Sequence, residues 1–304
     1  MNRMQGLQRI QAGESASVAA KAVGTNAKLL EELRESPNPL KELLGVTPED
    51  TPDNLVERTT LILGQLLLGR CAEIAFEGIY AQEMGTTDIA LIDLRESRSD
   101  TDYRLRNGQN RHLYRINIKF HGARFRRAKD LVGLDPEDCF PLATYKIHGA
   151  LQKQDEEHLP YIFAIISVPG VSAMETGTLV PKNSIRTLAF LRHAKVAGMR
   201  DLEDRLVKAF IDKGAEPYTA TYQKVLKAEW RILSARRAAN LLRDKLFERV
   251  YALRVRGFAQ QFRGAELDMH LSISQDMTPL REFLATLKSD GPTRTASLLE
   301  RGTL

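Results

Sequence analysis

The stretch of sequence that decides the fold is DYRLRNGQNRHLYRINIKF, residues 102–120. Apolar and polar side chains alternate over 102–106 and again over 112–120, which is the two-residue period of a half-buried β-strand. Between the two runs lies NGQN, residues 107–110, whose composition is typical of a tight turn. The sequence therefore predicts two antiparallel strands joined as a β-hairpin.

The predicted hairpin would gather polar side chains that suit metal chemistry. Asp102 begins its first strand, whereas Asn117 and Lys119 share one face of its second strand. A carboxylate, a carbonyl-bearing side chain and a lysine on neighbouring strands lie close enough to share one metal ion. Phosphodiester hydrolysis needs a polarised phosphate, an activated water and help for the leaving oxygen, and Mg²⁺ held by carboxylates supplies all three. Because a nearby lysine adds a donor to the phosphate oxygens, the hairpin predicts a phosphodiesterase.

The segments around the hairpin extend it to a mixed α/β pattern. Apolar residues recur at helical spacing over 53–80, whereas YIFAII at 161–166 is a short apolar run typical of a buried strand. In chain order the expected elements are a helix over 53–80, a strand over 89–94, the two hairpin strands, a basic loop over 121–135, a helix from 135 to 154 and a strand over 159–168. Three antiparallel strands followed by a helical crossover predict a mixed sheet flanked by helices.

The remainder of the chain is predicted to be mainly helical. Helices are expected over 26–35, 182–196, 200–213, 218–247 and 248–262 and from 278 to 287, with a strand over 267–274 and a mobile polar tail from 289. We therefore expect three regions: an N-terminal helical arm, 1–52; a core, 53–170; and a mainly helical C-terminal region, 171–304, that binds DNA or a second subunit.

The composition is that of a globular protein with a mild excess of positive charge. The 304 residues are 43% apolar and 27% charged, with a net charge of +5, which suits a polyanionic partner without requiring one. Cys71 and Cys139 form neither a disulfide framework nor a zinc motif, so we expect both to be buried. The sequence has no membrane-spanning apolar run, no signal-peptide pattern and no ATPase phosphate loop. A cytoplasmic protein without membrane contact is expected.

The order helix, three strands, helix, strand, with Asp102 on the second strand and Asn117-x-Lys119 on the third, resembles the PD-(D/E)xK nuclease superfamily, which includes most type II restriction endonucleases. The resemblance covers about residues 53–168. It implies an α/β (α+β) fold with a restriction-endonuclease-like αβββαβ core and a mixed sheet. It also implies a Mg²⁺-dependent endonuclease, in which Mn²⁺ can substitute, that cleaves double-stranded DNA as a homodimer in restriction or phage defence.

The resemblance implies a role for each matching residue. Asp102 matches the acidic metal ligand, and Lys119 matches the lysine that assists the attacking water or the phosphate. Asn117 falls where the superfamily usually has Asp or Glu, and its amide oxygen can bind Mg²⁺ but adds no charge. Glu73, in the preceding helix, matches an extra carboxylate found in part of the superfamily and would supply the second negative charge. Lys146, in the second core helix, could reach the same pocket.

Each of these residues also has a purely structural interpretation. Asp102 could be a turn residue in a polar cluster, and Asp93, which closes the first strand, is its main rival as a metal ligand. The predicted catalytic lysine could lie on the surface or pair with a carboxylate. Glu73 could face solvent or form an ion pair with Arg70, one helical turn earlier. Glu77, one turn further on, is a weaker rival for its place in the site.

Two basic segments are candidates for contact with nucleic-acid phosphates. The first, 120–129, directly follows the proposed lysine and interleaves four cations with aromatic residues. The second, 224–256, is predicted to be helical and carries ten cations against three acids. Either segment could instead be a solvated surface. The residues expected to contact DNA are Arg124, Arg126, Arg127, Lys129, Lys146, Arg236 and Arg237.

Two other functions remain open at this stage. A non-catalytic DNA-binding or assembly subunit would keep the nuclease fold, and Asn117 would then mark a lost active site. A nuclease directed at RNA would use the same chemistry on a different substrate. Cleavage assays on DNA and RNA, repeated after replacement of Asp102 or Lys119, would separate the three.

Overall fold

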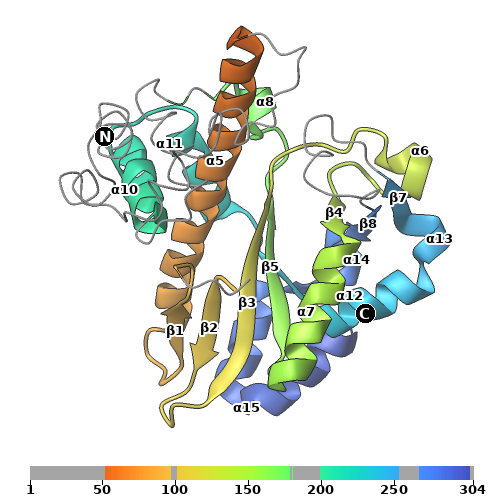
Figure 1. The fold of residues 1–304 in the computed structure, drawn as a ribbon. Helices are drawn as coiled ribbons and strands as arrows, with labels where there is room; N and C mark the ends of the chain where they lie inside the picture. The colour runs from red at the N-terminus through yellow and green to blue at the C-terminus, as the bar shows by residue number, and fades with distance from the viewer. Residues whose placement is uncertain (1–51, 97–100, 179, 181–198, 253–266, 302–304) are drawn as a thin grey trace, which may run out of the picture. The chain divides into compact units, whose positions relative to one another are not determined.

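The structure, a computed structural model, describes residues 52–96, 101–178, 180, 199–252 and 267–301 (Figure 1). The helices predicted over 26–35 and 182–196, and the N-terminal arm up to residue 51, therefore lie outside the described residues. The described residues of Gly64–Thr178 and Arg200–Leu304 belong to one compact unit. The sheet and the candidate site both lie in this unit.

Helix α5 (Pro52–Met84) confirms the helix predicted over 53–80. In its second half the apolar side chains recur every three or four residues and are buried, among them Ala72 and Phe76. The centre of the Phe76 ring lies 5.8 Å from that of Tyr103, which is in the second strand. α5 therefore covers one face of the sheet with its apolar side.

Three antiparallel strands follow α5, as the sequence predicts: β1 (Ala90–Asp93), β2 (Tyr103–Arg106) and β3 (His112–His121). In the hairpin, Tyr103 pairs with Ile116 and Leu105 pairs with Tyr114. These four side chains belong to the apolar core against α5, so the alternation seen in the sequence sets the register. The turn holds Asn110 at a left-handed φ of 66°, a conformation that asparagine tolerates.

The helical crossover and the strand after it are also present. Helix α7 (Thr144–Glu157) leads to β5 (Tyr161–Ser167), which pairs with β3 in parallel. The C-terminal region adds β6 (Arg231–Ser234) antiparallel to β5, and β9 (Thr278–Pro279) antiparallel to β6. The strand order is β1-β2-β3-β5-β6-β9, so the fold is mixed α/β with a six-stranded mixed sheet.

The helix predicted from 135 to 154 is wrong in its first part. Strand β4 (Cys139–Ala143) occupies this place, and α7 begins only after it. β4 pairs with β8 (Leu267–Ser272), and β7 (Val250–Ala252) pairs with the other side of β8, which makes a second, three-stranded sheet. The DPED sequence before β4 looks like a helix start, but the apolar residues after it are buried by pairing with a strand far along the chain.

The C-terminal region holds more strand than predicted. The helix predicted over 218–247 is interrupted: helices lie on both sides, but Ile232 and Leu233 enter the main sheet in β6. Of the helix predicted over 248–262, residues 250–252 form β7 instead, and 253–262 lie outside the described residues. The tail from 289 is not a loose end but continues the last helix, which bends at Gly291 (φ 73°). The remaining helices are α6 (Ala128–Val132), α8 (Ala173–Thr176), α10 (Met199–Asp212), α11 (Tyr218–Lys227), α12 (Ala235–Asp244), α13 (Leu246–Arg249), α14 (Ile273–Asp276) and α15 (Leu280–Arg301).

The main sheet separates two apolar cores. One face packs against α5 and α15 and includes Phe76 and Phe283. The other packs against α7, α12 and the second sheet, and it includes Phe163 and Leu241. β5 contributes side chains to both cores, as expected for a central buried strand. None of the helices in the described part of the chain has the length and apolar character that a membrane crossing requires.

Candidate active site

The candidate active site begins at the end of the hairpin where β2 starts. One residue before β2, the Asp102 N–H donates to the Ile116 carbonyl at 3.0 Å, and Asp102 Oδ2 accepts from the Ile118 N–H at 2.6 Å. Extending the β2–β3 register by one pair sets Asp102 opposite Asn117, and opposite residues share a face of the sheet. Both residues are 8% exposed. The hairpin therefore brings Asp102 and Asn117 together.

Lys119 lies two residues further along β3, on the same face as Asn117. Its ammonium nitrogen is 6.0 Å from the centre of the Phe163 ring in the neighbouring strand β5. The lysine is thus half-buried against an aromatic side chain rather than extended into solvent. Asn117 and Lys119 share the face of β3 that looks away from the α5 core, whereas Asp102 precedes β2 at the end of the sheet, where its carboxylate contacts the Ile118 N–H and Arg200.

Glu73, on α5, lies within electrostatic reach of Asp102. Burial is the largest cause that raises the pKa of the Glu73 carboxyl, and the negative charge of Asp102 raises it further, whereas neighbouring arginines oppose the shift. Glu73 Oε2 accepts from Arg70, three residues earlier, and from Arg95 Nη1 at 2.9 Å. Glu73 therefore forms the predicted ion pair with Arg70 and also interacts electrostatically with Asp102, the acid of the hairpin.

Arg95, the residue after Leu94 beyond the end of β1, is the centre of this polar network. It is only 6% exposed. Its guanidinium contacts the carboxylates of four residues at 2.7–3.0 Å, namely Glu73, Glu77, Asp93 and Asp204. The guanidinium carbon also lies 5.2 Å from the centre of the Tyr103 ring. The two rival acids, Asp93 and Glu77, therefore lie in the same network as Glu73 and bind the same arginine.

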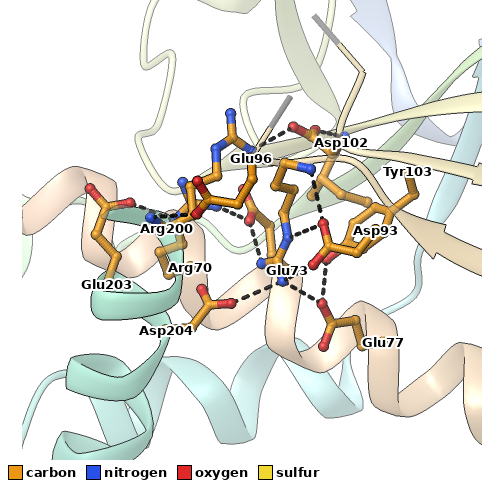
Figure 2. A network of polar contacts seen from close by, with 12 residues as sticks. Arg70, Glu73, Glu77, Asp93, Glu96, Asp102, Tyr103, Arg200, Glu203 and Asp204 are labelled. Carbon is orange, nitrogen blue, oxygen red and sulfur yellow. Dashed lines mark hydrogen bonds and ion pairs between the residues drawn. The ribbon is translucent and has the colours of Figure 1, made fainter. Parts of the chain in front are cut away.

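Helix α10 contributes three more charged side chains to the network (Figure 2). Arg200 Nη1 donates to Asp102 Oδ1 at 3.3 Å, and the Arg200 N–H donates to Glu96 Oε1 at 3.0 Å. Glu203 accepts from the arginine on α5 at 2.8 Å, and Asp204 pairs with the arginine after β1 at 2.9 Å. The first turn of α10 is thereby attached to both the hairpin and α5.

The sequence patterns missed Arg95, Arg200 and the two acids of α10. A signal was available for Glu203, which precedes Val207 by one helical turn and so falls on the buried face of an amphipathic helix. An acid on such a face requires a buried partner, and Glu203 is 1% exposed. Arg95 carries no comparable signal, because it lies outside any helix or strand and its partners come from three separate segments.

The network contains more acids than arginines. Among the described residues, its ion pairs join the carboxylates of Glu73, Glu77, Asp93, Asp102, Glu203 and Asp204 to the guanidinium groups of Arg70, Arg95 and Arg200, and Glu96 contacts Arg200 through the backbone N–H. Six ion-paired acids therefore face three arginines when every acid is ionised. Burial raises the pKa of Asp204, whereas for Asp93 hydrogen bonds from Arg95 outweigh the effect of burial and lower the pKa. The surplus of negative charge favours a further cation at this place.

The donor atoms fit Mg²⁺ in kind, but arginines already contact some of them. Mg²⁺ is commonly held by one or two carboxylates together with waters, and the carboxylates of Asp102 and Glu73 with the amide of Asn117 make such a set. Within the described ranges, no group of three or more His, Cys, Asp and Glu side chains is arranged to hold a metal ion. An ion at this place would compete with Arg200 for Asp102 and with Arg95 for Glu73.

The residues predicted to contact nucleic-acid phosphates lie in separate places. Arg126, Arg127 and Lys129 are exposed at the start of α6, and Arg124 beside them pairs with Glu137 at 3.2 Å. These four residues follow β3 directly, so they lie at the end of the strand that carries the proposed lysine. They remain candidates for phosphate contact.

The other predicted contacts are less concentrated than the sequence suggests. Lys146 is exposed on α7, with its ammonium nitrogen 5.0 Å from the centre of the neighbouring Tyr145 ring. Arg236 on α12 lies 3.5 Å from Glu300, and Arg237 is partly buried. Several other cations of the second basic segment also pair with acids, so its described part, up to residue 252, does not form one continuous basic face.

No protein-family model matches this chain, and comparisons with curated proteins and with solved structures give no match either. The function is therefore inferred from the strand pairing, the buried charges and the chemistry of the side chains themselves.

Proposed function

We propose that this chain is a Mg²⁺-dependent endonuclease that hydrolyses phosphodiester bonds in double-stranded DNA. The observation that carries the proposal is the β2–β3 register, in which Asp102 lies opposite Asn117 and Lys119 follows on the same face. The surrounding chain order supports it: a helix, three antiparallel strands, a helix and a strand parallel to the third, with α6 and β4 inserted before the second helix. This is the order of the PD-(D/E)xK nucleases that the sequence resembles.

The proposed roles follow from the position of each side chain. Asp102 and Glu73 would hold the metal ion at the end of the sheet, and the Asn117 amide oxygen would complete the protein ligands. When bound, Mg²⁺ or Mn²⁺ polarises the phosphate and lowers the pKa of a water molecule. Lys119 donates to a phosphate oxygen on which negative charge develops. The Asp102 side chain is oriented by the Ile118 N–H, so the hairpin backbone itself fixes this ligand.

The charge balance supports a cation at this site. Six ion-paired carboxylates face three guanidinium groups, and burial, the largest cause, raises the pKa of both Glu73 and Asp204 because their charged forms are poorly solvated there. A divalent cation stabilises those charged forms and leaves the acids ionised. A homodimer belongs to the same proposal, because one site per chain cuts one strand of a duplex. Restriction or phage defence is the setting we propose for this activity.

A second candidate function is a non-catalytic DNA-binding or assembly subunit. The observation that favours it is that arginines contact the two proposed carboxylate ligands: Arg200 contacts Asp102, and Arg95 contacts Glu73. With an amide at Asn117, these ion pairs would then be the permanent state of a site that binds no metal. The two proposals share a fold and differ in whether Mg²⁺ displaces an arginine.

Cleavage assays separate the two proposals. Supercoiled plasmid is incubated with the protein and Mg²⁺ or Mn²⁺, and the assay is repeated with Asp102→Ala, Lys119→Ala and, as a control, the exposed Lys213→Ala. The endonuclease proposal predicts nicking or linearisation by the wild type and by the control, and none by the two site variants. DNA binding without cleavage under either metal would favour the subunit. Cleavage of RNA but not of DNA would keep the site and change the substrate.

A further inference from the structure

Arg200 is placed to change partners when the proposed site is occupied. It lies in the first turn of α10, and its side chain is 29% exposed, whereas Arg70 and Arg95 are 6% exposed. Its contact with Asp102 Oδ1 measures 3.3 Å, which is long for a hydrogen bond between charged groups. Arg200 is therefore the most loosely held of the three arginines.

The surroundings of Arg200 differ on its two sides. On one side it meets Asp102, whose other carboxylate oxygen is fixed by the hairpin backbone. On the other side it lines a cavity of about 680 Å³ between α5, β1 and α10. The charged residues of α10 that line this cavity are three cations, Arg200, Arg205 and Lys208, and two acids, Asp201 and Asp204. A cavity of this volume accepts a nucleotide-sized group.

Arg95 cannot make the same exchange. It contacts four carboxylates and the face of Tyr103, and removing it would leave several buried acids without a partner. Among the described residues, the Arg200 side chain forms its ion pair with Asp102, and its backbone N–H is held separately by Glu96. The Arg200 guanidinium can therefore turn from Asp102 to another anion while the start of α10 stays attached.

We infer that Arg200 is a further catalytic residue, which binds the scissile phosphate once Asp102 has taken a metal ion. This inference rests on the proposed endonuclease function. Without metal, Arg200 neutralises Asp102. With metal at Asp102, the guanidinium turns to the nonbridging oxygens of the phosphodiester, where two parallel N–H donors match two oxygens. Arg200 thus competes with the metal ion for Asp102 when no DNA is bound, and it binds the phosphate of the substrate when the metal ion occupies Asp102.

These two roles predict opposite effects of one substitution. Arg200→Ala removes a competitor for Asp102, so the affinity for Mn²⁺ should rise, by about fivefold if the ion pair resembles other partly exposed pairs. The same change removes a donor to the phosphate, so the cleavage rate should fall about 10²- to 10³-fold. Arg200→Lys should restore part of the cleavage rate, because lysine contacts phosphate as a point charge. A side chain that only stabilises the fold would move both quantities in the same direction.

Mn²⁺ binding is measured by titration calorimetry on the full chain without DNA, and cleavage is measured separately on plasmid. Arg205→Ala is the matched control, since Arg205 lies one turn further on α10, lines the same cavity and pairs with Asp201. It should leave the Mn²⁺ affinity unchanged. Thermal melting of each variant shows whether the fold is intact.

The outcomes distinguish this inference from the function on which it rests. If Asp102→Ala leaves Mn²⁺ affinity unchanged, the proposed metal site itself fails. If Asp102→Ala abolishes Mn²⁺ binding but Arg200→Ala does not strengthen it, or if Arg200→Ala cleaves at the wild-type rate, only the role of Arg200 is overturned. Tighter Mn²⁺ binding together with slower cleavage supports the inference.

Discussion

Replacing Arg95 by methionine tests whether the buried charge network holds the site together. Methionine keeps an unbranched side chain against Tyr103 but removes the charge that faces four carboxylates. Of these carboxylates, Glu73 and Asp204 have side chains that are 15% and 12% exposed, so most of the loss falls on them. Removing one partner of a buried ion pair destabilises a protein by about 3–5 kcal/mol. We expect a loss of this size for Arg95→Met.

The melting temperature should fall accordingly. For a chain of this size, each kcal/mol lowers it by about 2–3 °C, which gives a decrease of about 6–15 °C for Arg95→Met. The exposed Arg243, which pairs with the adjacent Asp244, is the matched control, and Arg243→Met should melt with the wild type. Melting is followed by circular dichroism in the presence of a chelator. Millimolar Mg²⁺ should then recover more of the loss in Arg95→Met than it adds to the wild type.

The pH dependence of this loss has a definite sign. The pKa values of Glu73 and Asp204 are raised by burial, so their contribution to stability is complete below the usual carboxyl range and is lost as pH rises through the raised values. Arg95 opposes both shifts, so its removal should raise the two pKa values further. The difference between wild type and Arg95→Met should therefore be small near pH 4 and largest near pH 8. A difference below about 1 kcal/mol, or one that does not change with pH, would refute the reasoning, because it is what a surface pair gives.

Three further predictions concern other parts of the molecule. Asn117→Asp adds a carboxylate beside Asp102, so we expect Mn²⁺ affinity to rise about tenfold in calorimetry, with a lower melting temperature in chelator; an unchanged affinity would place Asn117 outside the metal site. Burial lowers the pKa of His270 to about 4, so stability should be lost as pH falls from about 6.5 to 4, and His270→Phe should flatten that part of a urea-denaturation profile, whereas an unaltered profile would contradict this. Phe76→Ala should lose about 3–5 kcal/mol in the same assay, because the ring packs on Tyr103 and Trp230; a loss under about 1 kcal/mol would mean that α5 is held mainly by its charges.

The elements with a strong local period could be predicted from the sequence. The helix over 53–80 and the hairpin strands each show one side-chain period over most of their length, and the structure confirms them as α5, β2 and β3. The buried strand β5 follows from its apolar run alone. In these segments, burial of one face by neighbouring elements agrees with the local preference of the backbone.

Elements that depend on distant partners could not be predicted in this way. β4 and β6 have 5 and 4 residues, too few for a periodic signal, and each is a strand because a pairing partner lies beside it. β6 in particular lies between two segments with helical patterns, so the local pattern predicts one helix that continues through it. The strand is fixed by β5, which precedes it by about 70 residues.

The same distinction between local and distant interactions applies to the residues of the candidate site. The positions of Asp102, Asn117 and Lys119 relative to one another follow from the hairpin register, which the sequence contains. The arginines around them do not, because Arg95 lies beyond the end of a strand and Arg200 begins a helix about 100 residues after Asp102. Their position is a property of the tertiary structure, and it decides which acids are neutralised without metal.

The pairing of β6 with β5 has a consequence for any attempt to isolate the part of the chain that carries the candidate site. A fragment that ends near residue 170 would keep every proposed metal ligand but would remove the partner from one side of β5. That strand is apolar on both faces, and six of its seven residues are buried. Freed of β6, it would present a row of unsatisfied N–H and C=O groups bordered by hydrophobic side chains, which is the kind of border along which chains join to one another. We therefore expect the excised fragment to aggregate. In the full chain, β6 from the second half of the polypeptide covers this edge of β5 and prevents such association.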